Sequence, residues 1–311
     1  EDNLSAMLLN NDVDPEVPEG TEYYLPAGSS YRVTPFALMK GFRLAGSRDG
    51  VKPIVVLEGS WSIAEGSYLS SLEFDNIEFR HEANNNYFMN TSKAYTIENV
   101  SFVNCDFISL RRGFWRHQSA NAKYIMNLEM EGCRFEGCGW QTSAYGAFNL
   151  QSFDKDNGVS YDQVDRAIFR NCTFSNDNDG TNGYGWGNLF YAPYMDKPID
   201  LEYKNVTIYN YSRNQRLINI ESAVGSKLVM EGILLASPCG DLFAIGANTT
   251  TTFSNNYTTA DYTLGGKNMN ATDLKITAAE LFADPANGDL TIKDTSSPIV
   301  SNRAGDTRWL P

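Results

Sequence analysis

The segment Phe102-Val-Asn104-Cys105-Asp-Phe107 recurs along the chain in a recognisable form. Its frame is an apolar residue, any residue, Asn or Gly, an apolar residue or Cys, any residue, and an apolar residue. Further copies lie at 74–79, 130–135, 169–174, 203–208 and 230–235, with weaker ones at 42–46 and 253–256. The Asn/Gly positions are Gly46, Asn76, Asn104, Gly132, Asn171, Asn205, Gly232 and Asn255, spaced 30, 28, 28, 39, 34, 27 and 23 residues apart. A period of about 30 residues with insertions of variable length predicts a solenoid.

The central Asn or Gly predicts a sharp corner, because these residues enter the left-handed backbone region most readily. Apolar and polar residues alternate on both sides of it, which is the periodicity of strands. A third short apolar segment follows most corners, at 87–90, 114–117, 147–151, 188–192, 217–221 and 242–245. We therefore expect three strands per turn and about nine or ten coils. A β-sandwich with coincidental spacing is the alternative, and the only helical turn expected lies at 277–283.

The composition of the chain excludes several classes of function. The 311 residues carry 25 Lys and Arg against 38 Asp and Glu, a net charge of −13. Nucleic-acid binding is excluded because phosphate contacts need clustered cations, and no apolar run is long enough for a membrane helix. The chain has only two histidines, His81 and His117, which disfavours His-based metal sites or catalytic triads. We expect a monomer with a lead-in or linker at 1–20, the repeat at 21–260, and a C-terminal cap and tail at 261–311.

A bent coil with stacked Asn corners resembles the right-handed parallel β-helix of the pectin-lyase-like superfamily over roughly residues 20–260. The segments LFADPANGDLTIKD (281–294), SSPIV (296–300) and GDTRW (305–309), with the opening TEYYLPAGSSYRV (21–33), resemble a narrower group. These are exported β-helix proteins of unassigned function in Gram-negative polysaccharide-utilisation systems. The resemblance implies an all-β, single-stranded, right-handed parallel β-helix with a C-terminal cap. It also implies export to the cell surface, with or without a lipid-anchored precursor, or to the periplasm.

Three of the five cysteines, Cys105, Cys133 and Cys172, occupy the position just after the corner. Other coils carry Ile or Val there, so the column is expected to face inward as free, buried thiols. Parallel stacked Cβ atoms suit a disulfide poorly. Cys138 and Cys239 lie outside this column, and no ligand set for zinc accompanies them.

Two consecutive inter-corner segments are long, and we expect their loops to form one wall of a cleft. They contain the candidate ligand-binding residues Trp140, Tyr145, Tyr184 and Trp186, among Asp and Asn residues that suit sugar hydroxyls. The alternative is that these rings pack the loops on themselves.

Basic residues supply the other candidates. The segment RRGFWRH (111–117) contributes Arg112, Trp115 and Arg116, which could meet an acidic sugar, and the ladder beside the corners contributes Arg134 and Arg170. The alternatives are pairing of the segment with Glu73, Asp75, Glu78 or Glu82, and a solvated face of alternating charge. Carboxylates of this ladder suit a glycosidase or a lyase, but the motifs of β-helix polygalacturonases are absent and no catalytic residue is assigned. The strings 154–158 and 177–180 raise Ca²⁺, but ordinary Asx turns are favoured and no cofactor or metal is expected.

The sequence therefore predicts an exported carbohydrate-binding protein. It would hold a polysaccharide or oligosaccharide on a ladder face walled by the aromatic loops within 136–200. A divergent polysaccharide lyase or glycoside hydrolase is the alternative, and a structural or adhesion solenoid is a further one. Scarce histidine favours binding over catalysis.

Overall fold

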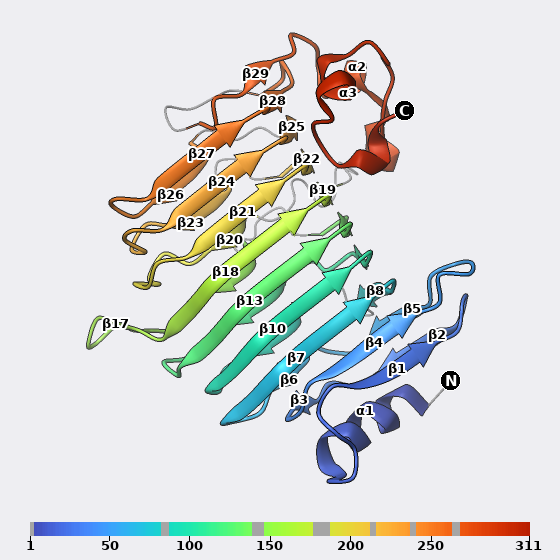
Figure 1. Ribbon diagram of the computed structural model, residues 1–311, viewed down its shortest axis with the longest axis vertical. Helices are drawn as coiled ribbons and strands as arrows, with labels where there is room; N and C mark the ends of the chain where they lie inside the picture. Colours follow the sequence, from blue (N-terminus) through green and yellow to red (C-terminus); the bar gives the residue numbers. More distant parts are fainter. Residues whose placement is uncertain are drawn as a thin grey trace.

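A computed structural model describes residues 3–81, 87–138, 146–176, 187–211, 216–236, 241–262 and 268–311. Strands dominate it, and most of them belong to three long parallel sheets (Figure 1). Sheet I contains β1 (Thr21–Leu25), β4 (Phe42–Gly46), β7 (Ser67–Asp75), β10 (Tyr95–Val103), β13 (Lys123–Glu131), β18 (Asp162–Arg170), β21 (Asp200–Lys204), β24 (Lys227–Glu231) and β27 (Thr250–Ser254).

Sheet II contains β2 (Ser30–Val33), β5 (Ile54–Leu57), β8 (Glu78–His81), β11 (Asp106–Ile108), β14 (Arg134–Glu136), β19 (Thr173–Ser175), β22 (Thr207–Tyr209), β25 (Leu234–Ala236), β28 (Tyr257–Thr258) and β29 (Thr272–Asp273). Sheet III contains β9 (Tyr87–Thr91), β12 (Gly113–His117), β15 (Gly146–Leu150), β20 (Asn188–Tyr191), β23 (Ile218–Ile220) and β26 (Phe243–Ile245). The chain visits the three sheets in rotation, and one such circuit is called a coil below. Each strand pairs in parallel with its equivalents in neighbouring coils, as Phe74, Phe102 and Met130 show. This arrangement is compatible with the expected parallel β-helix and is not that of an antiparallel sandwich.

The corners between sheets I and II follow the prediction at seven of the eight positions. Their φ angles lie between 49° and 66° at Asn76, Asn104, Gly132, Asn171, Asn205, Gly232 and Asn255. Asparagine side chains also bond from coil to coil, since Asn104 Nδ2 donates to Asn76 Oδ1 at 2.7 Å. The prediction is wrong at Gly46, which ends β4 without a left-handed φ. Glycine is needed there for space, because a Cβ would lie 2.2 Å from the carbonyl oxygen of Asn76.

Stacked side chains fill the interior between the three sheets. Phe79, Phe107, Phe135 and Phe174 form one column, with successive ring centroids 5.5, 4.7 and 4.8 Å apart. The predicted cysteine column is confirmed: Cys105, Cys133 and Cys172 are free and fully buried. Cys138 is also a free, buried thiol, whereas Cys239 lies outside the described residues. Burial raises the pKa of Cys138 to about 12, so its thiol stays protonated.

The N-terminal lead-in is helical rather than irregular. Helix α1 (Asn3–Val13) packs Leu4 and Leu8 into the main core beside the first coil. Asp12 Oδ1 accepts hydrogen bonds from the backbone amides of Met39 and Lys40, both at 3.0 Å. The helix therefore shields the first end of the ladder from solvent. Among the described residues, no helix is long and apolar enough to cross a membrane.

The C-terminal segment packs sideways onto the outer face of sheet II, where Figure 1 shows it beside β22, β25 and β28. It contains α2 (Ala278–Leu281), α3 (Pro298–Asn302), the 3₁₀ turns Pro285–Asn287 and Thr307–Trp309, and the antiparallel pair β30 (Phe282–Asp284) and β31 (Asp289–Ile292). The predicted helical turn is confirmed by α2, and Thr277 and Glu280 form a capping box at its N-terminus. Thr173 Oγ1 anchors the end of the chain, donating to Asp306 and accepting from Trp309 Nε1, both at 2.7 Å.

Candidate functional site

The connections from sheet II to sheet III are longest between β14 and β15 and between β19 and β20, and residues 139–145 and 177–186 within them lie outside the described residues. On the edge facing sheet I, the hairpin of β16 (Phe153–Asp154) and β17 (Val159–Ser160) follows β15. The expectation that two neighbouring coils carry the insertions holds, but the first insertion is divided between two edges of sheet III.

Polar side chains form one row across the outer face of sheet III. The parallel register aligns Asn90 with Arg116, Arg116 with Asn149, Asn149 with Tyr191, and Tyr191 with Asn219. Each of these residues lies between two buried neighbours along its strand, so its side chain projects from the outer face of the sheet. Asn90, Arg116 and Tyr191 are partly exposed there, whereas Asn149 and Asn219 are buried. Five consecutive coils thus place amides, a guanidinium and a phenol in a line.

A second outward position carries Tyr87 and, in the next two coils, glycines. Two consecutive residues turn inward after it, for example Phe114 and Trp115, and the register passes over one of them. The ring of Tyr87 lies against Gly113, where a Cβ would approach ring carbons of Tyr87 to 2.6 Å. Glycine in RRGFWRH therefore makes room for an aromatic ring from the preceding coil.

Two predicted ligand-binding residues meet on that ring. The guanidinium of Arg112 is 5.6 Å from the ring centroid of Tyr87, and that of Arg116 is 5.4 Å away. Both distances are those of cation–π contacts. Both arginines are partly exposed, whereas the Tyr87 ring that they contact is only 2% exposed, so this face presents positive charge over a buried ring.

A pair of stacked rings stands at the edge that faces sheet I. Phe153 and Tyr194 are partly exposed, and their centroids are 4.3 Å apart with an interplanar angle of 13°. Tyr191 of the polar row lies three residues before Tyr194. Burial, followed by the proximity of Tyr194 and Glu221, raises the pKa of Tyr191. Its hydroxyl therefore remains a hydrogen-bond donor at neutral pH.

Trp115 has no surface for a ligand, because its side chain is 0% exposed. Its Nε1 donates to Tyr95 Oη at 3.2 Å, and Tyr95 Oη lies 2.5 Å from His117 Nε2. His117 Nδ1 lies 2.6 Å from Asp162 Oδ1, and the other oxygen of Asp162 accepts from the amide of Ser152. Since a carboxylate only accepts, Nδ1 carries the proton and Nε2 accepts from Tyr95.

This Tyr–His–Asp chain is sealed from solvent and has no access for a substrate. Burial lowers the pKa of His117, although Asp162 acts to raise it, so the imidazole is neutral. The expectation that the segment around His117 pairs with acidic residues of the preceding coil is corrected for His117, whose partner Asp162 lies in a later coil. These hydrogen bonds between Tyr95, His117 and Asp162 link sheet III to sheet I in the buried interior, and we call them the buried brace.

The other predicted site residues do not join the polar row. Arg134 lies on sheet II and pairs with Glu136 at 2.9 Å, while Arg170 lies on sheet I and pairs with Glu202 at 3.1 Å. The corner residues divide the charged ladder between the outer faces of sheets I and II, so Arg134 and Arg170 lie on different sheets from the polar row. Trp140, Tyr145, Tyr184, Trp186 and the string 177–180 lie outside the described residues.

The string 154–158 forms an Asx turn, because Asp154 Oδ1 accepts from the amides of Asp156 and Asn157. Within the described part of the chain, no group of three His, Cys, Asp or Glu residues is arranged to hold a metal ion.

Sequence reasoning missed three of the five residues of the polar row, namely Asn90, Asn149 and Asn219, and also Tyr87 beside it. The signal was present in the third apolar segment of each coil, where one polar residue follows the inward pair at the same position.

Comparisons with protein-family models, curated proteins and solved structures find no match to this chain.

Proposed function

We propose that the chain is an exported, right-handed parallel β-helix of the pectin-lyase-like type that binds a polysaccharide or oligosaccharide on sheet III. One observation carries this proposal: a row of amide, guanidinium and phenol groups crosses the outer face of sheet III, where Asn90, Arg116 and Tyr191 are partly exposed and the β16–β17 hairpin follows one edge. Polar groups placed beside an aromatic pair, here Phe153 and Tyr194, are a common arrangement for binding a hydroxyl-rich ligand.

The dimensions of the row suit a chain-like ligand. Neighbouring parallel strands are about 4.8 Å apart, so five coils span about 19 Å along the ladder. Among the partly exposed members, the Asn90 amide and the Tyr191 hydroxyl both donate and accept, which matches sugar hydroxyls. The stacked Phe153 and Tyr194 offer an apolar surface at the edge. Arg112 and Arg116 favour sugars that carry a carboxylate.

The composition of the row favours binding over catalysis. Glycoside hydrolysis uses two carboxyl groups that flank the scissile bond. The five aligned positions hold Asn90, Arg116, Asn149, Tyr191 and Asn219, none of which is a carboxylate. The cell surface or the periplasm is the compartment we propose, in line with the resemblance of the chain's two ends to exported β-helix proteins.

Calorimetric titration with a panel of neutral and uronic-acid oligosaccharides tests the proposal. Arg116→Ala removes one charge-assisted contact and is expected to weaken binding of an acidic oligosaccharide by roughly 10- to 100-fold. Arg80→Ala is the matched control, because Arg80 is an exposed arginine of sheet II that pairs with Glu78. Absence of binding to every glycan, or equal affinity in Arg116→Ala and the wild type, would refute the site. Release of reducing ends or unsaturated products would support the enzymatic alternative instead.

A further inference from the structure

The four long strands of sheet I share an interruption that the other strands of this sheet lack. In β7, β10, β13 and β18 the register passes over one residue per strand, and two consecutive side chains project outward. We call the eight residues the kink: Ser70–Ser71, Glu98–Asn99, Met126–Asn127 and Asp165–Arg166. Because the pairs are aligned from coil to coil, the kink runs across the strands along the ladder.

Asparagine side chains bond the backbone carbonyls at the kink. Asn99 Nδ2 donates to the carbonyl oxygen of Ser70 at 3.2 Å, and Asn127 Nδ2 donates to that of Glu98 at 3.4 Å. Asn127 Nδ2 also lies 3.3 Å from Asn99 Oδ1, which links the two coils. Side-chain hydrogen bonds from Asn99 and Asn127 therefore stabilise the backbone at the kink.

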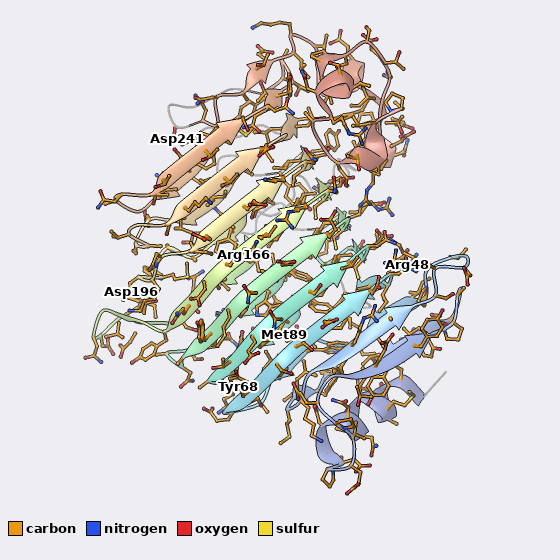
Figure 2. All side chains as sticks on the ribbon, viewed as in Figure 1. Arg48, Tyr68, Met89, Arg166, Asp196 and Asp241 are labelled. Carbon is orange, nitrogen blue, oxygen red and sulfur yellow. The ribbon has the colours of Figure 1, made fainter. Side chains whose placement is uncertain are left out.

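Two open hollows flank Arg166 on this face, and Figure 2 shows Arg166 near the middle of the sheet. One, of about 300 Å³, is lined by Asn99, Val100, Ser101, Asn127, Glu129 and Arg166. The other, of about 200 Å³, lies towards β21 and β24 and is lined by Arg166, Ile168, Asp200, Leu201, Glu202, Lys227 and Val229. Arg166 bonds Glu129 at 3.2 Å, and both side chains remain about half exposed.

Two tyrosines repeat one geometry beside the kink. Tyr68 donates its hydroxyl proton to Glu98 on the next strand, and Tyr124 donates to Asp165 on its next strand. The hydrogen bond to Asp165 raises the pKa of Tyr124 to about 12, which keeps this donor in place. Each hydroxyl therefore reaches a neighbouring strand, and the Tyr124 side chain is partly exposed. Tyr68 is 55% exposed, and Figure 2 shows it towards one end of the sheet face.

The register sets the distance between these rings. Tyr68 pairs with Thr96, and Thr96 pairs with Tyr124, so the rings are two strands apart along the ladder. Two strand spacings amount to roughly 9.6 Å. In an extended β-1,4-linked glycan, every second sugar presents the same face, and this repeat is one disaccharide long. The ring spacing therefore matches alternate sugars of such a chain.

We propose that the outer face of sheet I is a second binding surface, for an extended β-1,4-linked neutral glycan that lies along the ladder. Alternate sugars stack on Tyr68 and Tyr124, and the sugar between them meets Thr96, which lies between the two tyrosines in the register. An α-1,4-linked glycan curves and does not keep this repeat. The surface is independent of the polar row on sheet III, because the two sheets face different directions.

Titration with β-1,4-linked gluco- and manno-hexasaccharides, their disaccharides, and an α-1,4-linked glucohexasaccharide tests this inference. We expect the β-1,4 hexasaccharides to bind best and the disaccharides to bind weakly, because a disaccharide spans only one ring. Tyr68→Ala and Tyr124→Ala should each weaken hexasaccharide binding roughly three- to tenfold, and Tyr68→Phe should retain most of it. Tyr24→Ala is the matched control, since Tyr24 is 62% exposed on the same sheet but outside the line of rings.

The two proposed sites fail separately. Arg116→Ala should leave β-1,4 hexasaccharide binding unchanged if sheet I holds this ligand. If Arg116→Ala abolishes it while Tyr68→Ala and Tyr124→Ala do not, the inference about sheet I is wrong and the site on sheet III stands. Equal binding of the α-1,4 hexasaccharide, or no binding of β-1,4 hexasaccharides, would also overturn it. Thermal unfolding of each variant establishes that the fold is retained.

Discussion

Replacing Gly113 by Ala tests the packing that builds the face of sheet III. The added Cβ would lie 2.6 Å from two ring carbons of Tyr87 and 3.2 Å from the carbonyl oxygen of Gly146. The first approach is too close for any pair of carbon atoms, so the ring of Tyr87 must move. Its movement would also displace Arg112 and Arg116, whose guanidinium groups lie over the ring.

The expected loss of stability follows from two opposing effects. Overpacking costs about 1–3 kcal/mol. The backbone at Gly113 does not have a left-handed φ, so Ala is compatible with it and stabilises by about 0.4–1 kcal/mol through the unfolded chain. The net expectation for Gly113→Ala is a loss of about 1–2 kcal/mol in the free energy of unfolding, and Tyr87→Ala alone should lose about 3–5 kcal/mol because its side chain is buried.

Urea unfolding of the wild type, both single variants and the double variant measures the coupling. In the double variant the ring that obstructs the new Cβ is gone. The loss in its free energy of unfolding should therefore be smaller than the sum of the two single losses by about 1–2 kcal/mol. Gly113→Ala should also weaken binding of an acidic oligosaccharide. If Gly113→Ala is as stable as the wild type and the two changes are additive, the proposed contact between Tyr87 and Gly113 is refuted.

Three further predictions concern the core, the corners and the buried brace. Phe135→Ala should cost about 3–5 kcal/mol in urea unfolding, since its fully buried ring stacks between two others 4.7 and 4.8 Å away; a loss below 1 kcal/mol would contradict the stacked core. Asn104→Ala should cost about 1–2 kcal/mol, because Ala enters the left-handed region poorly and loses the bond to Asn76, while Asn104→Gly should cost less; equal costs would refute the conformational argument. The lowered pKa of His117 means that the unfolded chain takes up a proton near its ordinary value of 6.5 while the folded chain does not. Stability should therefore fall as pH decreases below about 6.5, by up to about 1.4 kcal/mol per pH unit. The same titration of His117→Gln should show a flatter profile between pH 7.5 and 5.5, and identical profiles would contradict the assignment.

The fold was predictable because its signal repeats in every coil. A corner of one Asn or Gly between alternating apolar residues is a local pattern, and seven of its eight copies adopt the expected backbone. Gly46 shows the limit of the pattern, since glycine serves both positive φ and close approach, and the sequence alone does not separate them. The helix α1 was missed because Leu4 and Leu8 are too few to establish a period next to Pro15 and Pro18.

The candidate site was predictable only in part. Charge identified Arg112 and Arg116, whose guanidinium groups lie over the ring of Tyr87. Aromatic character identified Trp115, which turns inward beside Phe114 because two consecutive residues of β12 face the core. Strict alternation would place either Phe114 or Trp115 on the outer face. A prediction based on a period of two therefore fails where two consecutive residues both face the core. The outward row became clear only when the register aligned the strands of sheet III.

Photo-crosslinking tests the central claim, that a glycan lies along the polar row of sheet III. A uronic-acid oligosaccharide carrying a diazirine would be bound, irradiated and located by peptide mass spectrometry. We predict adducts on peptides that contain β12, β15 and β20, competed by unlabelled oligosaccharide and lost in Arg116→Ala. Adducts confined to sheet II or the C-terminal segment, or none above the uncompeted background, would contradict the claim.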